Sequence, residues 1–243
     1  MKKMKNILFL IGIIIGAISF NSCELDNYDG PNASLSGAFI DNETGEQIES
    51  DLISGTQVEL IEHGFENPSI QRIVVQVDGT YRDDMMFEGT YSIPPIMRGN
   101  FVPPIDDDPA TNDTLIIEIK GNTVHNFVVQ PYIRVKDANI TIDGTKITAT
   151  FKLQQTVENK VKAIGLFGHI SPAVGEPMQV GKKTKTLNKV VDPDEEFELV
   201  LDVRTDKDFE KGKAYHFRIG AVIDAAEAEY NYAPAVRLMI PEE

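Results

Sequence analysis

Three consecutive aspartates, Asp106, Asp107 and Asp108, form the densest group of metal-binding side chains in the sequence. Carboxylate oxygens are ligands that Ca²⁺ accepts, but the spacing does not match an EF-hand loop, and Pro109 interrupts it. The surrounding segment, residues 94–113, is rich in proline, and long loops in compact domains often carry binding function. We predict no metal site, and a stiff, solvated loop is the simpler interpretation. If a site exists, these three aspartates are the candidate calcium ligands.

Residues for catalysis do not fall into any recognisable set. Zinc spacing is missing among the histidines, which are His63, His125, His169 and His216. The sequence also has no G-x-S-x-G elbow for a serine nucleophile. A glycosidase needs two carboxyl groups about 5–10 Å apart. The sequence is rich in acidic residues, but it does not show whether any two of them lie at that distance. We predict a protein that is not an enzyme and has no cofactor.

Aromatic rings are the other groups with a chemical role, because the C–H face of a sugar packs on a flat ring. The sequence has no tryptophan. The remaining candidates for ligand binding are Phe101 in the proline-rich loop, and Tyr230 and Tyr232 near the C-terminus. Separately, Thr114 lies in a three-residue motif that resembles the acceptor for protein O-glycosylation in Bacteroidetes, so it is a candidate glycosylation site.

Cys23 is the only cysteine, so a disulfide and a thiolate zinc site are excluded. Lysines near the N-terminus precede an apolar run from Ile7 to Ile18, which is shorter than the roughly 20 residues that span a bilayer. This pattern is typical of a signal peptide; an uncleaved membrane anchor is the alternative. Residues 20–23 resemble a bacterial lipobox, with Phe20 in place of the usual leucine. The resemblance implies that Cys23 is the lipid-anchored first residue of the mature chain.

The formal net charge of −15 bears on possible partners. So acidic a surface repels phosphate backbones, and no basic stripe interrupts it, so we predict no nucleic-acid binding. The charge also argues against direct contact with an anionic membrane surface. The lipid anchor is therefore the expected membrane contact.

Short β-branched runs, separated by Gly, Pro, Asn and Asp, indicate strands throughout. Alternation is clear over 146–153, 196–203 and 215–223, where every second residue is apolar, as in a sheet with one face in water. On this pattern His216 and Arg218 face solvent. The Asp-Gly pairs at 78–79 and 143–144 predict hairpins, and the lysines of 182–185 are expected at a basic hairpin tip. No convincing helix is predicted, apart from a turn or two over 224–230.

These elements predict an all-β protein with two consecutive antiparallel β-sandwich domains after a lipoprotein signal peptide and a short tether. The signal peptide is residues 1–22, and the tether is 23–33, polar and interrupted by Gly30-Pro31. The domains are residues 34–130 and 131–243, each of ordinary size.

The first domain resembles the carboxypeptidase-regulatory-like (transthyretin-like) module. The motif carrying the resemblance begins with Gly37, Asp41 and Thr44-Gly45, and continues with Asp78-Gly79-Thr80-Tyr81 and Gly89-Thr90-Tyr91. The second domain is similar to fibronectin-III or immunoglobulin-like sandwiches, with Tyr215 in the place of the corner tyrosine. As a whole, the chain resembles a family of Bacteroidetes surface lipoproteins of unassigned function, often encoded in polysaccharide-utilisation loci.

That resemblance implies an outer-membrane lipoprotein at the cell surface, lipid-anchored, and accessory to a polysaccharide-uptake system. Its implied partners are the membrane, a glycan, and a SusC/SusD-like transporter complex. It supplies no catalytic or binding residues. The alternative that stays open is a structural, adhesion or protein-docking module of the cell surface.

Overall fold

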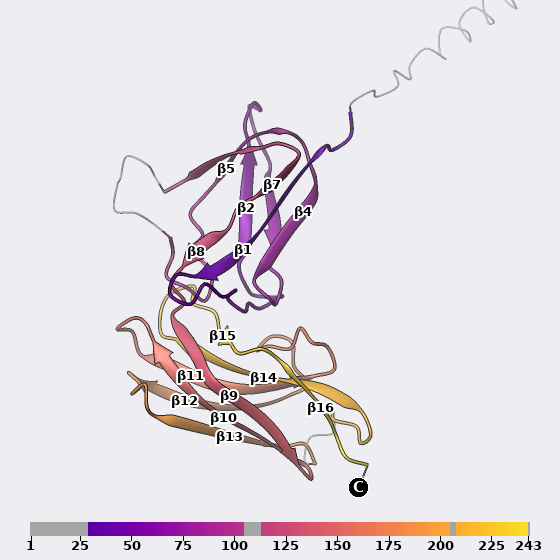
Figure 1. Ribbon diagram of the computed structural model, residues 1–243, viewed down its shortest axis with the longest axis vertical. Coiled ribbons are helices and arrows are strands. Elements are labelled where there is room, and N and C mark those ends of the chain that lie inside the picture. The colour runs from indigo at the N-terminus through magenta and orange to yellow at the C-terminus, as the bar shows by residue number, and fades with distance from the viewer. Residues whose placement is uncertain (1–28, 105–112, 205–207, 243) are drawn as a thin grey trace, which may run out of the picture. The chain divides into compact units, whose positions relative to one another are not determined.

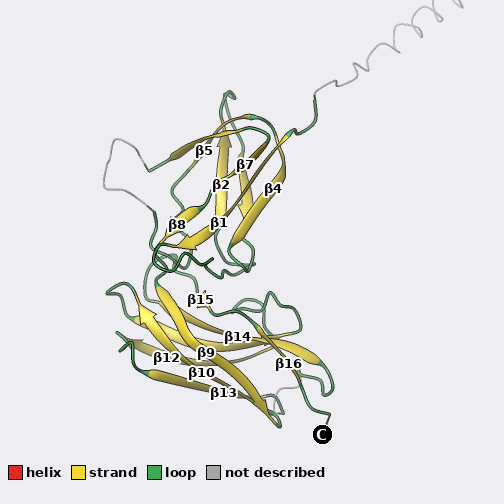
Figure 2. Cartoon of the chain, viewed as in Figure 1, coloured by secondary structure: helices red, strands yellow, loops and turns green. Residues whose placement is uncertain are grey.

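The computed structural model describes residues 29–104, 113–204 and 208–242. Contacts group Pro31–Glu243 into one compact unit, distinct from Met1–Gly30. Within the described residues the chain forms strands, turns and loops without a helix, which confirms the all-β prediction (Figure 2). No helix long and apolar enough to cross a membrane occurs in the part of the chain that is described.

The N-terminal domain is built from two packed sheets (Figure 1). One has the order β4-β1-β7, with β8 also paired to β1, and the other has the order β3-β2-β5-β6. β1 runs parallel to β7 and β8, while the other pairs are antiparallel. The strands are β1 (Ala33–Asp41), β2 (Gln57–Glu62), β3 (Ile70–Val74), β4 (Thr80–Met86), β5 (Gly89–Ile93), β6 (Leu115–Ile119), β7 (Asn122–Val124) and β8 (Phe127–Val129).

The C-terminal domain pairs a sheet of order β13-β10-β9 with a sheet of order β12-β11-β14-β15, in which β16 also pairs with β14. All of its pairs are antiparallel. The strands are β9 (Ile133–Asp143), β10 (Lys146–Gln155), β11 (Val161–His169), β12 (Gly181–Lys189), β13 (Glu196–Asp202), β14 (Ala214–Ile223), β15 (Asn231–Tyr232) and β16 (Val236–Met239).

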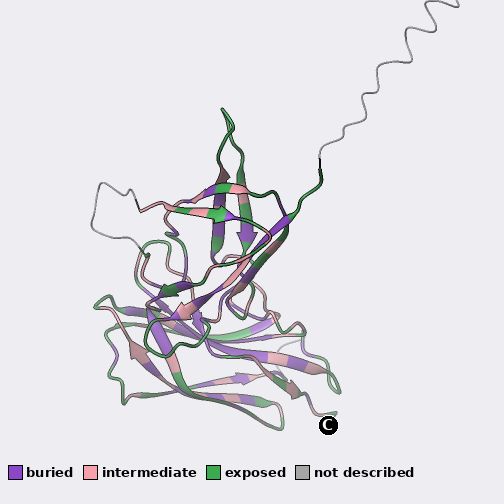
Figure 3. Cartoon of the chain, turned by 45° about the horizontal axis from the view of Figure 1, so that its top comes forward, coloured by how far each residue is buried: buried purple, intermediate pink, exposed green. Residues whose placement is uncertain are grey.

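Buried and more exposed residues alternate along strands of both sandwiches (Figure 3), and the buried residues form the two cores. On β10, Ile147, Ala149, Phe151 and Leu153 are buried between the sheets, while the lysines and threonines between them are more exposed. Period-two patterning puts one side of a strand in the core and the other in water. The N-terminal domain has a separate core that includes Leu35, Phe39, Leu60 and Tyr91.

The two predicted Asp-Gly hairpins have different outcomes. Asp143-Gly144 joins β9 to β10 as an antiparallel hairpin, with Gly144 at a φ of 55°. Asp78-Gly79 forms a tight turn, with Gly79 at 81°, but it connects β3 to β4, which belong to different sheets. Each Asp-Gly pair therefore determined a turn. Which strands pair with each other depended on the rest of the sheet.

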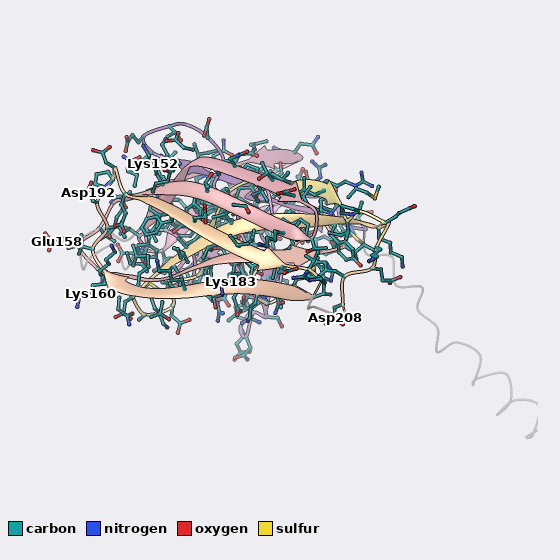
Figure 4. The ribbon with its side chains drawn as sticks, turned by 90° about the horizontal axis from the view of Figure 1, so that it is seen from below. Lys152, Glu158, Lys160, Lys183, Asp192 and Asp208 are labelled. Atoms are coloured by element: carbon teal, nitrogen blue, oxygen red, sulfur yellow. The ribbon has the colours of Figure 1, made fainter. Side chains whose placement is uncertain are left out.

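Lys182–Lys185 belong to β12, an edge strand, which corrects the predicted hairpin tip. Lys183 is paired with Leu166 and Lys185 with Ile164, both buried residues of β11. Directly paired side chains point to the same side of a sheet, so these lysines lie at the rim of the core with their ammonium groups exposed. Figure 4 shows Lys183 on this sheet and Lys152 of β10 on the other.

Tyr215 has the contacts that the fibronectin-like resemblance implies. Its hydroxyl donates a hydrogen bond to the Asp208 carbonyl at 3.3 Å and accepts one from the Glu210 amide at 3.0 Å. Bonding back to the backbone a few residues upstream is the geometry of a tyrosine corner.

Candidate functional site

Phe101, predicted as a sugar-stacking ring, is a core residue. It is 2% exposed, and its ring stacks on Phe39 with centroids 5.0 Å apart. No ring face remains for a ligand. This prediction is therefore corrected: proline-rich flanks suggested an exposed loop, but the sandwich closes over residues 99–101.

Tyr232 and Tyr230 also pack inside the protein. Tyr232 is 7% exposed, donates a hydrogen bond to Asp51 Oδ2 at 3.0 Å, and accepts one from the Glu176 amide at 2.8 Å. Tyr230 is partly buried, edge-on to Phe167 and stacked on Tyr232. The pair is a packing element between strands, which corrects the prediction of an exposed platform.

The other predicted site residues are only partly visible in the structure. Cys23 and the aspartates Asp106, Asp107 and Asp108 lie outside the described residues. Thr114 is partly exposed just before β6. Across the described chain, no group of three or more His, Cys, Asp or Glu side chains is arranged to hold a metal ion.

A cleft opens where the described start of the proline-rich loop leaves β5. Its volume is about 520 Å³. We call it the β2–β5 cleft, and its lining residues are Ile53, Ser54, Gly55, Gln57, Glu59, Pro94, Pro95, Ile96, Met97 and Arg98. Gln57 and Glu59 come from the outward face of β2, because the alternate residues Val58 and Leu60 are in the core. The loop singled out from the sequence thus forms one wall of a cavity.

One wall of the cleft is apolar and exposed. Ile53 is 56% exposed and Met97 is 51% exposed, and Pro94 and Pro95 line the same cleft. Ligand pockets typically combine apolar walls with a few polar groups that set orientation. This wall can pack against the C–H face of a ring-shaped ligand.

The polar groups of the cleft are held in place by neighbouring side chains. Arg98 Nε donates to the Ser54 carbonyl at 2.9 Å, and its guanidinium pairs with Glu229. Glu59 accepts from Arg72 Nε at 2.8 Å. Gln57, in contrast, is exposed, and its amide offers both donors and an acceptor to a ligand.

A second hollow, of about 410 Å³, lies beside the start of β9 and is mostly polar; its lining residues are Asn42, Glu43, Gln130, Arg134, Gln154, Gln155 and Thr156. Gln154 and Gln155 are shared with an adjoining hollow that extends to Lys136, Lys152 and Asp194. We call the first hollow alone the polar groove. No apolar side chain is among its lining residues, so it lacks the apolar wall of the β2–β5 cleft.

Arg218 is a residue whose role the sequence did not reveal. Its alternation on β14 predicted a solvent-facing side chain, yet it is 1% exposed. Its guanidinium donates to four backbone carbonyls and one carboxylate, those of Ser50, Val77, Val174, Ala233 and Glu49. The guanidinium also lies 4.2 Å from the centroid of the Tyr232 ring, a cation–π contact.

Burial explains the electrostatics of this cluster. It lowers the pKa of Arg218 against the opposing effect of Glu49, and it raises the pKa of Glu49. Three of the five acceptors, Ser50, Val77 and Glu49, belong to the N-terminal domain. Arg218 therefore joins the two domains. The one visible signal was an arginine within the otherwise apolar run 217–223.

Two further pairs belong, with the Arg218 cluster, to what we call the interdomain seam. Arg134 donates to both oxygens of Asp41, at 2.5 and 2.7 Å, with both side chains 7% exposed. Asn231 Nδ2 donates to the Asn100 carbonyl at 2.7 Å, and the Asn100 side chain donates to the carbonyls of Glu49 and Tyr230. No buried side-chain nitrogen or oxygen lacks a hydrogen bond in the described structure.

Comparison with known proteins assigns both domains. Residues 33–130 match the family model "Protein of unknown function (DUF3823) N-terminal domain", and residues 133–237 match "Domain of unknown function (DUF3823_C)". A solved structure from Bacteroides uniformis, described as a candidate carbohydrate-binding protein, is 31% identical with a TM-score of 0.74, and the match covers 86% of this chain and 100% of that one. The chain belongs to the DUF3823 family. This confirms the resemblance to a Bacteroidetes family of unassigned function.

Other DUF3823 structures share the fold. One from Parabacteroides merdae is 21% identical with a TM-score of 0.71, and the match covers 86% of this chain and 100% of that chain. One from Bacteroides ovatus is 23% identical with a TM-score of 0.68, and the match covers 86% and 99%. No curated protein matches the sequence.

Proposed function

We propose that this DUF3823 protein is a non-catalytic outer-membrane lipoprotein that binds carbohydrate as an accessory component of a polysaccharide-uptake system. The observation that carries the binding proposal is the β2–β5 cleft, in which an exposed apolar wall faces polar groups. The 31% identical relative described as a candidate carbohydrate-binding protein supports the same ligand class.

The chemistry of a sugar matches this cleft on two counts. A pyranose has an apolar C–H face, for which Ile53 and Met97 provide exposed side chains. Its hydroxyl groups both donate and accept hydrogen bonds, as does the amide of Gln57. The absence of tryptophan is compatible with such a site, because prolines and methionine can supply the apolar surface.

The carboxylates of the cleft support a non-catalytic role. Glu59 is the cleft's only acidic lining residue among those described, and it is paired with Arg72 at 2.8 Å. Glycoside hydrolysis requires a pair of carboxyl groups across the bond to be broken. A lone carboxylate held by an arginine is suited to binding a hydroxyl group.

Calorimetric titration of the mature chain with soluble polysaccharides tests the binding proposal. Gln57→Ala should weaken binding roughly fivefold, because one net hydrogen bond is worth about 1 kcal/mol. Gln154→Ala, in the polar groove, is the matched control and should leave affinity unchanged. The absence of any binding heat across a broad panel of plant and host glycans would refute the proposal. Loss of binding only in Gln154→Ala would move the site to the polar groove.

The membrane part of the proposal rests on Cys23 and the segment before it. Replacing Cys23 by Ser should move the protein from the membrane fraction into the soluble fraction and abolish labelling with a radioactive fatty acid. Unchanged membrane retention without any lipid label would refute lipidation. Co-purification of a transporter with the wild-type protein would support the accessory role.

A docking module is the second candidate, and one feature favours it. On the outward face of the β3-β2-β5-β6 sheet, Ile70 is paired with Ile61, and Ile116 continues the row beyond Ser92. Ile70 is 46% exposed and Ile116 is 55% exposed. Exposed apolar surface of this kind marks protein contacts when it is contiguous. Cross-linking on intact cells that is lost in Ile70→Lys with Ile116→Lys, while glycan binding persists, would support docking.

A further inference from the structure

Arg98 is the only basic residue among those that line the β2–β5 cleft in the described structure. An arginine in a sugar site usually raises the question of an acidic ligand, because its planar guanidinium binds a carboxylate or sulfate through two parallel hydrogen bonds. Whether Arg98 can do so depends on which of its N–H groups are already engaged.

Two nitrogens of the Arg98 guanidinium, Nε and Nη2, donate hydrogen bonds, whereas Nη1 is near a carboxylate but beyond hydrogen-bond distance. Nε donates to the Ser54 carbonyl at 2.9 Å, Nη2 pairs with Glu229, and Nη1 lies 3.8 Å from Glu227. The side chain of Glu229 is 19% exposed, whereas that of Glu227 is 60% exposed. Glu229 is therefore the sheltered partner, and Glu227 is the solvated one.

Backbone hydrogen bonds hold both carboxylates beside the arginine. The Gly99 amide donates to the Glu227 carbonyl at 3.2 Å, and the Glu229 amide donates to the Gly99 carbonyl at 2.9 Å. Residues 227–229 thus bracket the residue that follows Arg98. Glu227 has a φ of 55°, which marks a tight turn at this point. These backbone hydrogen bonds keep the side chains of Arg98 and Glu229 close together.

The charge around the cleft also disfavours anions. Two carboxylates, those of Glu227 and Glu229, lie beside the single guanidinium of Arg98, and the whole chain has a net charge of −15. A field of this sign lowers the local concentration of an acidic polymer. An uncharged sugar is unaffected by it.

We propose that the β2–β5 cleft is selective for uncharged sugars, and that Glu229 determines this selectivity by neutralising the charge of the Arg98 guanidinium. Neutral glucans, mannans or xylans are then the ligand class, and uronic-acid or sulfated glycans are excluded. This inference rests on the proposed carbohydrate-binding function and adds the class of sugar to it.

The test compares the wild-type protein with Glu229→Gln and Glu227→Gln, which remove the same charge at the sheltered and the solvated partner. Binding is measured to a neutral panel (glucan, mannan, xylan) and to an acidic panel (polygalacturonate, heparin). We expect the wild type to bind only neutral glycan, with affinity unchanged between 50 and 500 mM NaCl, as an uncharged ligand requires.

Glu229→Gln should gain affinity for acidic glycan by about tenfold or more, because the charge of the Arg98 guanidinium is then no longer balanced by Glu229 and can form charge-assisted hydrogen bonds with an anionic group. That gain should disappear at 500 mM NaCl, and Glu227→Gln should show little of it. A shared thermal midpoint for the three proteins establishes that they are equally folded.

The outcomes are distinguishable. A wild-type protein that binds acidic glycan, or whose binding weakens with salt, overturns the selectivity proposal whether or not the variants fold. A folded Glu229→Gln that gains no acidic binding overturns the role of Glu229. If no protein binds any glycan, the proposed function itself fails.

Discussion

Arg218 and Arg72 each pair with a glutamate, in opposite environments. The side chain of Arg218 is 1% exposed and that of its partner Glu49 is 25% exposed, whereas Arg72 and Glu59 are 52% and 37% exposed. Water solvates the second pair, so its attraction is nearly cancelled by hydration and lost side-chain entropy. In the first pair, removal of the arginine leaves a carboxylate and several buried carbonyls without a hydrogen-bond donor.

Arg218→Met should therefore lower the free energy of unfolding by about 3 kcal/mol, within the range for breaking a buried pair. Arg72→Met is the matched control and should cost less than about 1 kcal/mol. Urea denaturation followed by tyrosine fluorescence measures both. Equal effects of the two substitutions would contradict the role assigned to Arg218.

Asp41 makes part of the stability depend on pH. Burial alone would raise its pKa, but hydrogen bonds from Arg134 and from the amides of Glu43 and Thr44 outweigh burial and lower the pKa below its ordinary value of 3.8. For a carboxyl group with a lowered pKa, stabilisation is present above the ordinary value and is lost as pH falls through the folded value.

Asp41→Asn should thus destabilise the protein at pH 7, and the difference from the wild type should shrink below about pH 4. Urea denaturation at pH 7, 5 and 3 measures this difference. A difference that stays constant down to pH 3 would show that the charge of Asp41 contributes nothing.

Edge strand β12 shows at the scale of an element how the sandwich avoids unwanted pairing. Lys183 and Lys185 occupy positions opposite buried residues of β11. Lysines that point inward at a sheet edge hinder another strand from adding there, because their charges would be buried in the new interface. Their alkyl chains cover the rim of the core while the ammonium groups stay in water.

Replacing Lys183 and Lys185 together by valine should promote self-association through β12, visible as dimers or larger species in light scattering. Thr184→Val with Thr186→Val adds apolar surface to the opposite face of the same strand and leaves both lysines in place. The threonine variant should remain as monodisperse as the wild type. Equal association of both variants would point to general hydrophobicity instead.

The interdomain seam is expected to make the two domains unfold together. Contacts group Pro31–Glu243 into one compact unit, although the family models and the two cores divide it into two domains. Buried arginines in the seam, Arg134 and Arg218, each have a carboxylate partner across it. Separating the domains would leave each of these arginines without its carboxylate partner. We therefore expect that the domains do not separate unless they also unfold.

Differential scanning calorimetry should accordingly give one transition, with the calorimetric enthalpy equal to the van't Hoff enthalpy. In the combined variant Arg218→Met with Arg134→Met, the domains should unfold separately, as two transitions. Two transitions already present in the wild type would show that the seam does not couple them.

The sequence by itself determined the local structure of this protein. Alternation at Ile147, Ala149, Phe151 and Leu153 predicted a strand and its buried side, because period two follows from the geometry of the strand alone. The turn at Gly144 was equally local. The resemblance of the chain as a whole was enough to indicate the family.

Tertiary structure alone decided which residues meet across long separations. Arg218 read as solvent-facing, since one strand cannot reveal that a second layer covers its outer side. From the sequence, Phe101 was predicted to be exposed. Its burial depends on how the core closes over a proline-rich loop, and local sequence does not reveal that. The β2–β5 cleft brings residues 53–59 together with residues 94–98. Arg98 and Glu229 are 131 positions apart and meet only after both sandwiches have formed and packed.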